Sequence, residues 1–293
     1  MIKFEGIMPA LVTPLNEDET IRVEALRPLI DHLCQKGADG FYVGGATGEG
    51  LALKTEERMI LAEEAKKAID GRVPMIVQVA AGDYNDALLL AKHAESIGAD
   101  AISATPPMFF QYDKDDVYNY YKRLAGSVHI PLMMYYNPNT GFNFDAKYAA
   151  RLFEVDNITA IKWTSSDYFE MIRLKDLTNG EMNVINGPDQ MLLMGLNAGA
   201  DGGIGSTYNY MMDYIKSVYT CFRNGDISAA QAWQNKADRV IEVLHKYKTI
   251  PASKVILEKM GFAVGNATFP MKRYSTEEKE IMINEFRAAG LDI

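Results

Sequence analysis

One lysine of the chain stands where it could act as a nucleophile. Lys162 lies near the end of the apolar run 158–164, which alternates with period 2 and is therefore predicted to be a β-strand. On this strand Lys162 shares a face with Ala160 and Thr164, whereas the bulky Trp163 points the other way. The small and polar face predicts a cavity. An amine that loses hydration in a cavity has a lowered pKa, and the free amine attacks carbonyl groups, so the segment indicates Schiff-base chemistry.

The same lysine has a second interpretation. A lysine on an exposed edge strand discourages aggregation, and residues 158–164 alone do not separate the two roles. The other strand ends must decide between them.

A glycine-rich turn follows an earlier apolar run. The motif Gly44-Gly-Ala-Thr-Gly-Glu49 exposes backbone N–H groups and the hydroxyl of Thr47, which together can bind a carboxylate or a phosphate. The motif is equally typical of a plain turn in which Thr47 or Thr55 caps the next helix.

Three further strand ends carry polar residues. Alternation lets only one of Tyr135 and Tyr136 face the same side as a ligand, and a phenol there could transfer protons, but the pattern does not say which. Asp189 follows another run and suits either a helix cap or a hydroxyl-binding carboxylate. The segment 202–207 is rich enough in glycine to let a ligand touch the backbone.

These residues need elements that bring the strand ends together. Apolar runs typical of strands occur at 6–15, 40–45, 74–80, 101–105, 131–136, 158–164, 182–185 and 202–206, with helical segments between them, among them 23–36, 54–69, 85–97 and 114–124. This β-α alternation predicts a parallel (β/α)8 TIM barrel, whose reactive groups lie at the carboxyl ends of the strands. An open, doubly wound parallel sheet is the alternative.

The last part of the chain has a different pattern. Helical segments alone follow the eighth run, at 211–223, 227–247, 251–260 and 276–289. We therefore expect a barrel domain over residues 1–224 and a C-terminal helical extension over 225–293. Three Gly-Ala-Asp segments, beginning at Gly37, Gly98 and Gly199, predict helix ends in which the glycine is left-handed.

Composition narrows the class of protein. The chain has 293 residues, of which 48% are hydrophobic and 24% charged, which is typical of a soluble globular protein. A net charge of −9 disfavours nucleic acid and membrane surfaces as partners, and no run is apolar enough to span a bilayer. The N-terminus lacks the pattern of a signal peptide, and Cys34 and Cys221 are too few for a disulfide scaffold. We therefore expect a cytoplasmic protein.

Metal chemistry is not indicated by the sequence. The four histidines, His32, His93, His129 and His245, fall on predicted helices or before a strand rather than at strand ends. A metal-dependent aldolase is therefore disfavoured, and no metal site is expected.

The order and spacing of four motifs resemble one enzyme family. The turn at 44–49, the Tyr135 strand, Ile161-Lys162 and the segment 199–207 are similar to the N-acetylneuraminate lyase and dihydrodipicolinate synthase family of pyruvate-dependent class I aldolases. The resemblance covers essentially the whole chain. It implies a barrel with a helical extension, a homotetramer, and a lysine imine with pyruvate in place of any external cofactor.

The resemblance also implies roles for single residues. Lys162 corresponds to the imine-forming lysine, Tyr135 to the proton-transferring phenol, and Ala46 with Thr47 to the pyruvate-carboxylate site, Thr47 being counted as catalytic. The positions that contact the sugar-derived part of the substrate in the lyases correspond to Thr164, Gly187, Asp189, Gln190 and Ser206.

Departures from the family pattern bear on the substrate. The lyases usually have Ser and Glu where this chain has Ala46 and Gln190, so the grip on a polyol is weakened. The synthases usually carry an arginine after the tyrosine strand, which is absent from residues 138–141, and a tyrosine where this chain has Phe109. We therefore expect a lyase of a pyruvate-derived keto acid, with N-acetylneuraminate as first choice. The second choice is a dihydrodipicolinate synthase. Ranked below it are another keto-sugar-acid aldolase or dehydratase and a non-catalytic pyruvate sensor.

Overall fold

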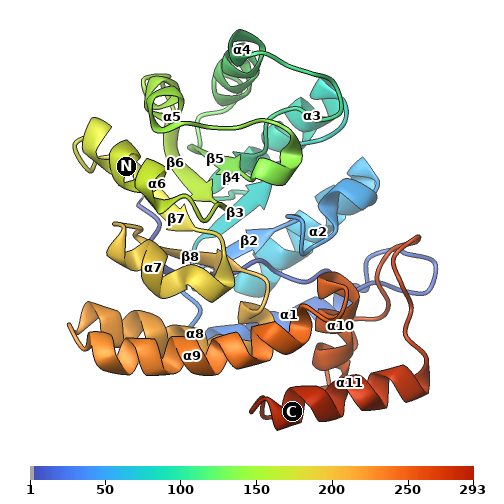
Figure 1. The fold of residues 1–293 in the computed structure, drawn as a ribbon. Helices are drawn as coiled ribbons and strands as arrows, with labels where there is room; N and C mark the ends of the chain where they lie inside the picture. Colours follow the sequence, from blue (N-terminus) through green and yellow to red (C-terminus); the bar gives the residue numbers. More distant parts are fainter. Residues whose placement is uncertain (1–2) are drawn as a thin grey trace.

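A computed structural model describes residues 3–293 and contains a barrel of eight parallel strands (Figure 1). The strands are β1 Gly6–Pro9, β2 Phe41–Val43, β3 Met75–Gln78, β4 Ala101–Ala104, β5 Leu132–Tyr136, β6 Ile158–Trp163, β7 Asn183–Asn186 and β8 Gly202–Gly205. Strands β2 to β8 pair in sequence order and β8 pairs with β1. A single parallel bridge between Ala10 and Tyr42 then joins β1 to β2. The predicted barrel is confirmed, and the open doubly wound sheet is wrong.

The barrel helices cover the outside of the strands. They are α1 Val23–Gln35, α2 Thr55–Ile69, α3 Tyr84–Ser96, α4 Lys114–Ala125, α5 Ala146–Phe153, α6 Tyr168–Leu177, α7 Leu192–Asn197 and α8 Tyr208–Arg223, with 3-10 turns η1 Gly50–Ala52, η2 Pro138–Thr140 and η3 Asp189–Met191. The expected glycine ends are present, because Gly37, Gly98 and Gly199 all have positive φ. Within residues 3–293 no helix combines the length and apolarity that crossing a membrane requires.

Three further helices complete the chain: α9 Ile227–Leu244, α10 Thr249–Lys259 and α11 Thr276–Ala288. Helix α9 runs alongside α8, and α10 and α11 contact each other, with α10 also touching α8 and α11 touching α9 (Figure 1). These helices form the C-terminal helical extension of the barrel.

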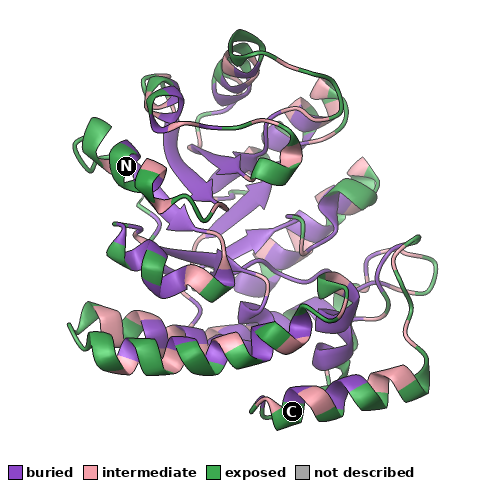
Figure 2. Ribbon diagram, in the orientation of Figure 1, coloured by how far each residue is buried: buried purple, intermediate pink, exposed green. Residues whose placement is uncertain are grey.

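The strands are buried (Figure 2), and two apolar cores contain their side chains. The outer core packs the strands against the helices and contains Ile161 and Trp163. The inner core fills the barrel lumen with Phe4, Met8, Ala10, Tyr42, Ile76, Ala101, Met133, Tyr135, Ala160, Ile185 and Ile204. The predicted alternation of β6 is therefore confirmed, because Ala160 faces the lumen and its bulky neighbours do not.

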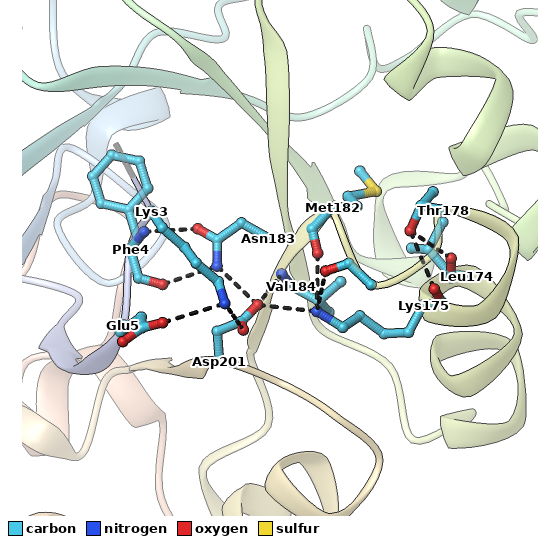
Figure 3. A network of polar contacts seen from close by, with 11 residues as sticks. Lys3, Phe4, Glu5, Leu174, Lys175, Thr178, Met182, Asn183, Val184 and Asp201 are labelled. Carbon is cyan, nitrogen blue, oxygen red and sulfur yellow. Dashed lines mark hydrogen bonds and ion pairs between the residues drawn. The ribbon is translucent and has the colours of Figure 1, made fainter. Parts of the chain in front are cut away.

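Polar clamps close the amino-terminal end of the barrel. Asp201, just before β8, accepts a hydrogen bond from the Val184 N–H of β7 and pairs with Lys3 and Lys175 (Figure 3). Asn183 links Asp201 to the backbone of Phe4, whose ring plugs the lumen. This end of the barrel is thus held by side chains whose charges and hydrogen-bonding groups pair with one another.

Candidate active site

Lys162 lies inside the barrel near the carboxyl end of β6. Its side chain is buried, with 6% of the residue exposed. Its Nζ atom lies 4.3 Å from the ring centroid of Tyr135 on β5 and 4.7 Å from that of Tyr42 on β2. Tyr135 and Lys162 are register partners in the β5–β6 ladder, so the backbone pairing itself brings phenol and amine together.

The structure resolves which tyrosine of β5 faces the lumen. Tyr135 belongs to the lumen core, whereas Tyr136 packs outside the strands against Trp163, with ring centroids 4.7 Å apart. Burial raises the pKa of the Tyr135 phenol. The positive charge of Lys162 and the nearby polar side chains of Asn137 and Thr164 oppose that rise and leave the pKa below its ordinary value of 10.0. A phenol with this environment is suited to proton transfer.

The glycine-rich turn lies at the carboxyl end of β2. Thr47 is half-buried and Ala46 is exposed. Within residues 3–293 no oxygen accepts a hydrogen bond from the N–H group of Ala46 or of Thr47. Helix α2 begins at Thr55 after the N-cap Lys54, so neither threonine caps it. The turn therefore presents free N–H donors, which can hold a carboxylate.

An ion pair that sequence reasoning missed anchors this turn. Glu49 and Lys254 of α10 are both almost completely buried and lie 2.7 Å apart, between Glu49 Oε1 and Lys254 Nζ. Glu49 Oε2 also accepts hydrogen bonds from the N–H and hydroxyl of Thr268, at 2.6 and 2.9 Å. The one available signal was a lysine inside the apolar stretch of α10. The C-terminal extension thus holds the turn in place.

A cavity of about 560 Å³ lies at the carboxyl ends of β5 to β8, and Lys162, Tyr135, Ala46 and Thr47 are not among the residues that line it. Its lining comes from the ends of four strands and from the extension: residues 137–139, 164–166, 187–191, 206 and 207, together with Ile241, Leu244 and Thr249. A volume of this size suits a small organic ligand. Five of the predicted residues line it, namely Thr164, Gly187, Asp189, Gln190 and Ser206. The three residues from the extension were not predicted.

Thr164 and Gly187 bring the β6 and β7 ends into contact. The Gly187 N–H donates to the Trp163 carbonyl at 2.8 Å. A Cβ atom at Gly187 would overlap the hydroxyl of Thr164, so only glycine permits this approach. The Oγ1 atom of Thr164 is buried with no hydrogen-bond partner among the described residues. An unsatisfied hydroxyl beside a cavity is available to a ligand.

Asp189 supports the β8 end rather than capping a helix. Its Oδ2 atom accepts hydrogen bonds from the N–H and hydroxyl of Thr207, at 2.8 and 2.7 Å. Burial raises the pKa of Asp189, and the bonds from Thr207 and the charge of Lys162 only partly oppose that rise. Gln234 of α9 donates to the Asp189 carbonyl at 3.2 Å, which ties the segment to the extension. Gln190, the next residue, is exposed on the cavity wall.

The cavity has no cationic side chain in its lining, among residues 3–293. Its β5 side is formed by Pro138 and Asn139, in the loop where the synthases usually carry an arginine. Phe109, which stands where the synthases usually have a tyrosine, is 94% exposed and has a φ of 85°. In the described part of the chain, no three His, Cys, Asp or Glu side chains gather as metal ligands would.

Comparisons with known proteins agree with this geometry. Residues 3–289 match the dihydrodipicolinate synthetase family. The chain belongs to this family. It is 37% identical to an N-acetylneuraminate lyase of Rhizobium meliloti over 272 residues, which are 93% of this chain and 91% of that protein. The family resemblance is thereby confirmed.

Solved structures of family members have the same architecture. The N-acetylneuraminate lyase of Proteus mirabilis superposes with a TM-score of 0.94 at 30% identity, over 99% of this chain and 100% of that one. A dihydrodipicolinate synthase of Bacillus anthracis superposes with a TM-score of 0.93 at 26% identity, over 98% and 99%. Because the sequence relatives are lyases over nearly their full length, the chain is an enzyme, a carbon–carbon lyase.

Proposed function

We propose that this family member cleaves a pyruvate-derived 2-keto acid through an imine on Lys162, and that N-acetylneuraminate is the substrate. The observation that carries the proposal is the position of Lys162. It is a buried amine in the lumen, beside a phenol of lowered pKa. Its covalent imine would take the place of any external cofactor.

The first step is attack of the Lys162 amine on the C2 carbonyl of the keto acid, with loss of water. The protonated imine then accepts the electron pair of the C3–C4 bond as that bond breaks. Tyr135 takes the proton of the C4 hydroxyl, so the leaving part departs as an aldehyde. Protonation of the resulting enamine and hydrolysis of the imine release pyruvate and the free lysine.

The turn after β2 supplies the second requirement, a fixed carboxylate. The free N–H groups of Ala46 and Thr47, with the Thr47 hydroxyl, would hold the substrate carboxylate and orient C2 toward Lys162. Because Glu49 is locked to Lys254 and Thr268, these donors are fixed before the substrate arrives.

The polar wall of the cavity supports a hydroxyl-rich leaving part. The unsatisfied hydroxyl of Thr164 lies at this wall, and Gln190 and Ser206 also line it. The named relatives support N-acetylneuraminate as the first substrate to test. Dihydrodipicolinate synthase stays the second candidate, because no arginine or lysine of residues 3–293 lines the cavity to bind the carboxylate of aspartate semialdehyde.

Borohydride trapping tests the imine. Pyruvate and borohydride together should leave one reduced pyruvyl adduct on Lys162, because only an imine is reduced to a stable secondary amine. Lys162→Ala should lose the adduct and the turnover, while Lys175→Ala, at the other end of the barrel, should keep both. An adduct mapped to another lysine would overturn the proposal.

A substrate comparison tests the leaving part. Pyruvate release from N-acetylneuraminate should exceed condensation of pyruvate with aspartate semialdehyde. If condensation is faster than cleavage, dihydrodipicolinate synthase becomes the first candidate function.

Assembly and location are further parts of the proposal. A homotetramer is what the family resemblance implies, and exposed Phe110, Phe169 and Ile172 are apolar surface that subunit contacts would cover. Light scattering on the purified protein tests this state. Cys34 and Cys221 are both free thiols, which supports a reducing, cytoplasmic location.

A further inference from the structure

A second tyrosine lies against the amine of Lys162. Tyr42 is the middle residue of β2, is fully buried, and belongs to the lumen core. Its ring centroid is 4.7 Å from Lys162 Nζ. The ring stands edge-on to that of Tyr135, with centroids 6.1 Å apart and planes at 82°. The amine is thus flanked by two aromatic rings, of which only Tyr135 has a place in the reaction described above.

The ring of Tyr42 is held at both ends. Its hydroxyl donates to Ser103 Oγ on β4, at 3.0 Å, which reaches past the intervening strand β3. The other side of the ring packs directly against Gly45 of the carboxylate-binding turn. The approach is so close that a Cβ atom at Gly45 would lie 2.5 Å from Tyr42 Cε1. A single side chain therefore connects the turn, the amine and the opposite wall of the lumen.

The two tyrosines differ in their tendency to ionise. Burial raises the pKa of Tyr42, with a further contribution from Tyr135, whereas the pKa of Tyr135 itself is lowered. Tyr42 therefore stays a neutral phenol under conditions in which Tyr135 can give up its proton. A neutral ring within about 6 Å attracts a cation to its face, and the attraction is stronger in a desolvated site.

We propose that Tyr42 is a positioning residue whose ring face supports the protonated imine formed on Lys162 Nζ. Resting on the proposed imine function, this inference adds a role for a residue that does not touch the substrate. After loss of water the nitrogen carries a positive charge as the protonated imine. The ring face of Tyr42 stabilises this intermediate and holds it under the turn at Ala46 and Thr47.

Other charged and titratable groups surround this pair. Tyr135 on β5 and Asp189 after β7 interact with the charge of Lys162, and Arg58 of α2 acts on Tyr42. The test must therefore separate the effect of the Tyr42 ring face from the effects of these charges and from the effect of lost packing.

Two substitutions make that separation. Tyr42→Phe keeps the ring and removes the bond to Ser103, whereas Tyr42→Leu removes the ring. Tyr121→Leu is the matched control, because Tyr121 is also fully buried but lies in the outer core, where its hydroxyl donates to the Ala104 carbonyl. Each variant is titrated with pyruvate under borohydride trapping across a range of pH.

The expected result separates the variants. In Tyr42→Leu the apparent affinity for pyruvate falls by about 10-fold, which is the range of a desolvated cation–π contact. The midpoint of the pH profile for trapping moves down by about one unit, because the protonated imine has lost its support and gives up its proton at a lower pH. Tyr42→Phe restores both quantities to near wild type. Tyr121→Leu lowers the melting temperature and changes neither.

A second series covers the case in which Tyr42→Leu does not fold. Phenylalanines with increasing numbers of fluorine atoms at position 42 keep the ring shape but withdraw charge from its face, so pyruvate affinity should fall with each fluorine. A flat response, or an unmoved pH midpoint in a folded Tyr42→Leu, overturns the inference while the imine function stands. A wild type that traps no pyruvate overturns both.

Discussion

The two ends of the barrel use the same residue types for opposite purposes. At the amino-terminal end, Asp39, Asp100 and Asp201 each accept a backbone N–H from the neighbouring strand, from Ile7, Met75 and Val184 respectively. Each also pairs with a lysine of a barrel helix, namely Lys216 of α8, Lys66 of α2 and Lys175 of α6. Every charge at these three positions is matched.

At the carboxyl-terminal end Glu49 and Asp189 are satisfied by Lys254 and Thr207, but two other groups are left available. Lys162 lies over aromatic rings rather than against a carboxylate, and Thr164 Oγ1 has no partner among the described residues. Matched charges stabilise a fold, whereas an unmatched buried amine is reactive. The comparison teaches that substitutions at the first end should act on stability and those at the second on turnover.

Among variants that keep Lys162, the largest effect is expected at Tyr135. Tyr135→Phe should lower kcat by about 10² to 10⁴-fold, because it removes a proton-transferring hydroxyl and little volume. The pKa of Tyr135 is lowered, so its phenolate forms at pH values below the ordinary phenol pKa of 10.0. Wild-type kcat should therefore rise as the pH increases toward 10. The variant should lose this rise. Tyr136→Phe is the control, and a larger loss there would exchange the roles of the two residues.

The next effect belongs to the amino-terminal clamp. Asp201→Ala should lower the free energy of unfolding by about 2–3 kcal/mol, because the Val184 N–H and Lys175 lose their acceptor. Chemical denaturation measures the change. The kcat of the folded variant should match wild type, and a selective loss of kcat would break the contrast between the two ends.

The same clamp has a defined pH dependence. Burial raises the pKa of Asp201, but bonds from Lys3, Asn183 and the Val184 N–H outweigh burial and hold it below the ordinary 3.8. A carboxyl with a depressed folded-state pKa stabilises fully above its unfolded value and loses that contribution as pH falls through the folded value. The stability difference between wild type and Asp201→Ala should therefore narrow as the pH falls below about 4.

A smaller effect is expected on the cavity wall. Gln190→Glu should improve kcat/KM for N-acetylneuraminate by about tenfold, because a charged acceptor binds a hydroxyl more strongly than a neutral one by roughly 1.4 kcal/mol. Trapping of pyruvate on Lys162 should not change. An unimproved variant would mean that the exposed side chain at position 190 does not reach the leaving part.

The smallest effect is expected from chelation. Exhaustive treatment with a chelator should leave kcat unchanged, since the protonated imine provides the electron sink that a metal provides in other aldolases. If activity is lost on chelation and restored by zinc, the reaction at the carboxyl-terminal end is that of a metal-dependent aldolase.

Local patterns in the sequence predicted much of this arrangement. The β-α alternation, the glycine ends of three helices and the lumen face of Lys162 all follow from short-range periodicity. The first strand was expected to reach residue 15 but ends at Pro9, because residues 10–15 form a buried loop that is as apolar as a strand. The short helices α5, α6 and α7 were not singled out.

Other features have no local signal. All five residues of β5 are buried, so polarity could not assign Tyr135 to the lumen and Tyr136 to the outer core. The Glu49–Lys254 pair joins residues from opposite ends of the chain. The role of Tyr42 requires the cross-lumen contact with Lys162, which only the closed barrel creates.

The seam between β1 and β2 has a consequence for dynamics. One bridge joins these strands, at Ala10 and Tyr42, and the Leu11 N–H donates to the Tyr42 carbonyl there, at 2.9 Å. Local opening takes place where few hydrogen bonds must break, so this amide should exchange with solvent sooner than those of the β5–β6 ladder. Opening would carry Tyr42 away while Lys162 and Tyr135 stay paired on intact strands. The exchange of the Leu11 amide would then report how readily the β1–β2 seam opens beside the site.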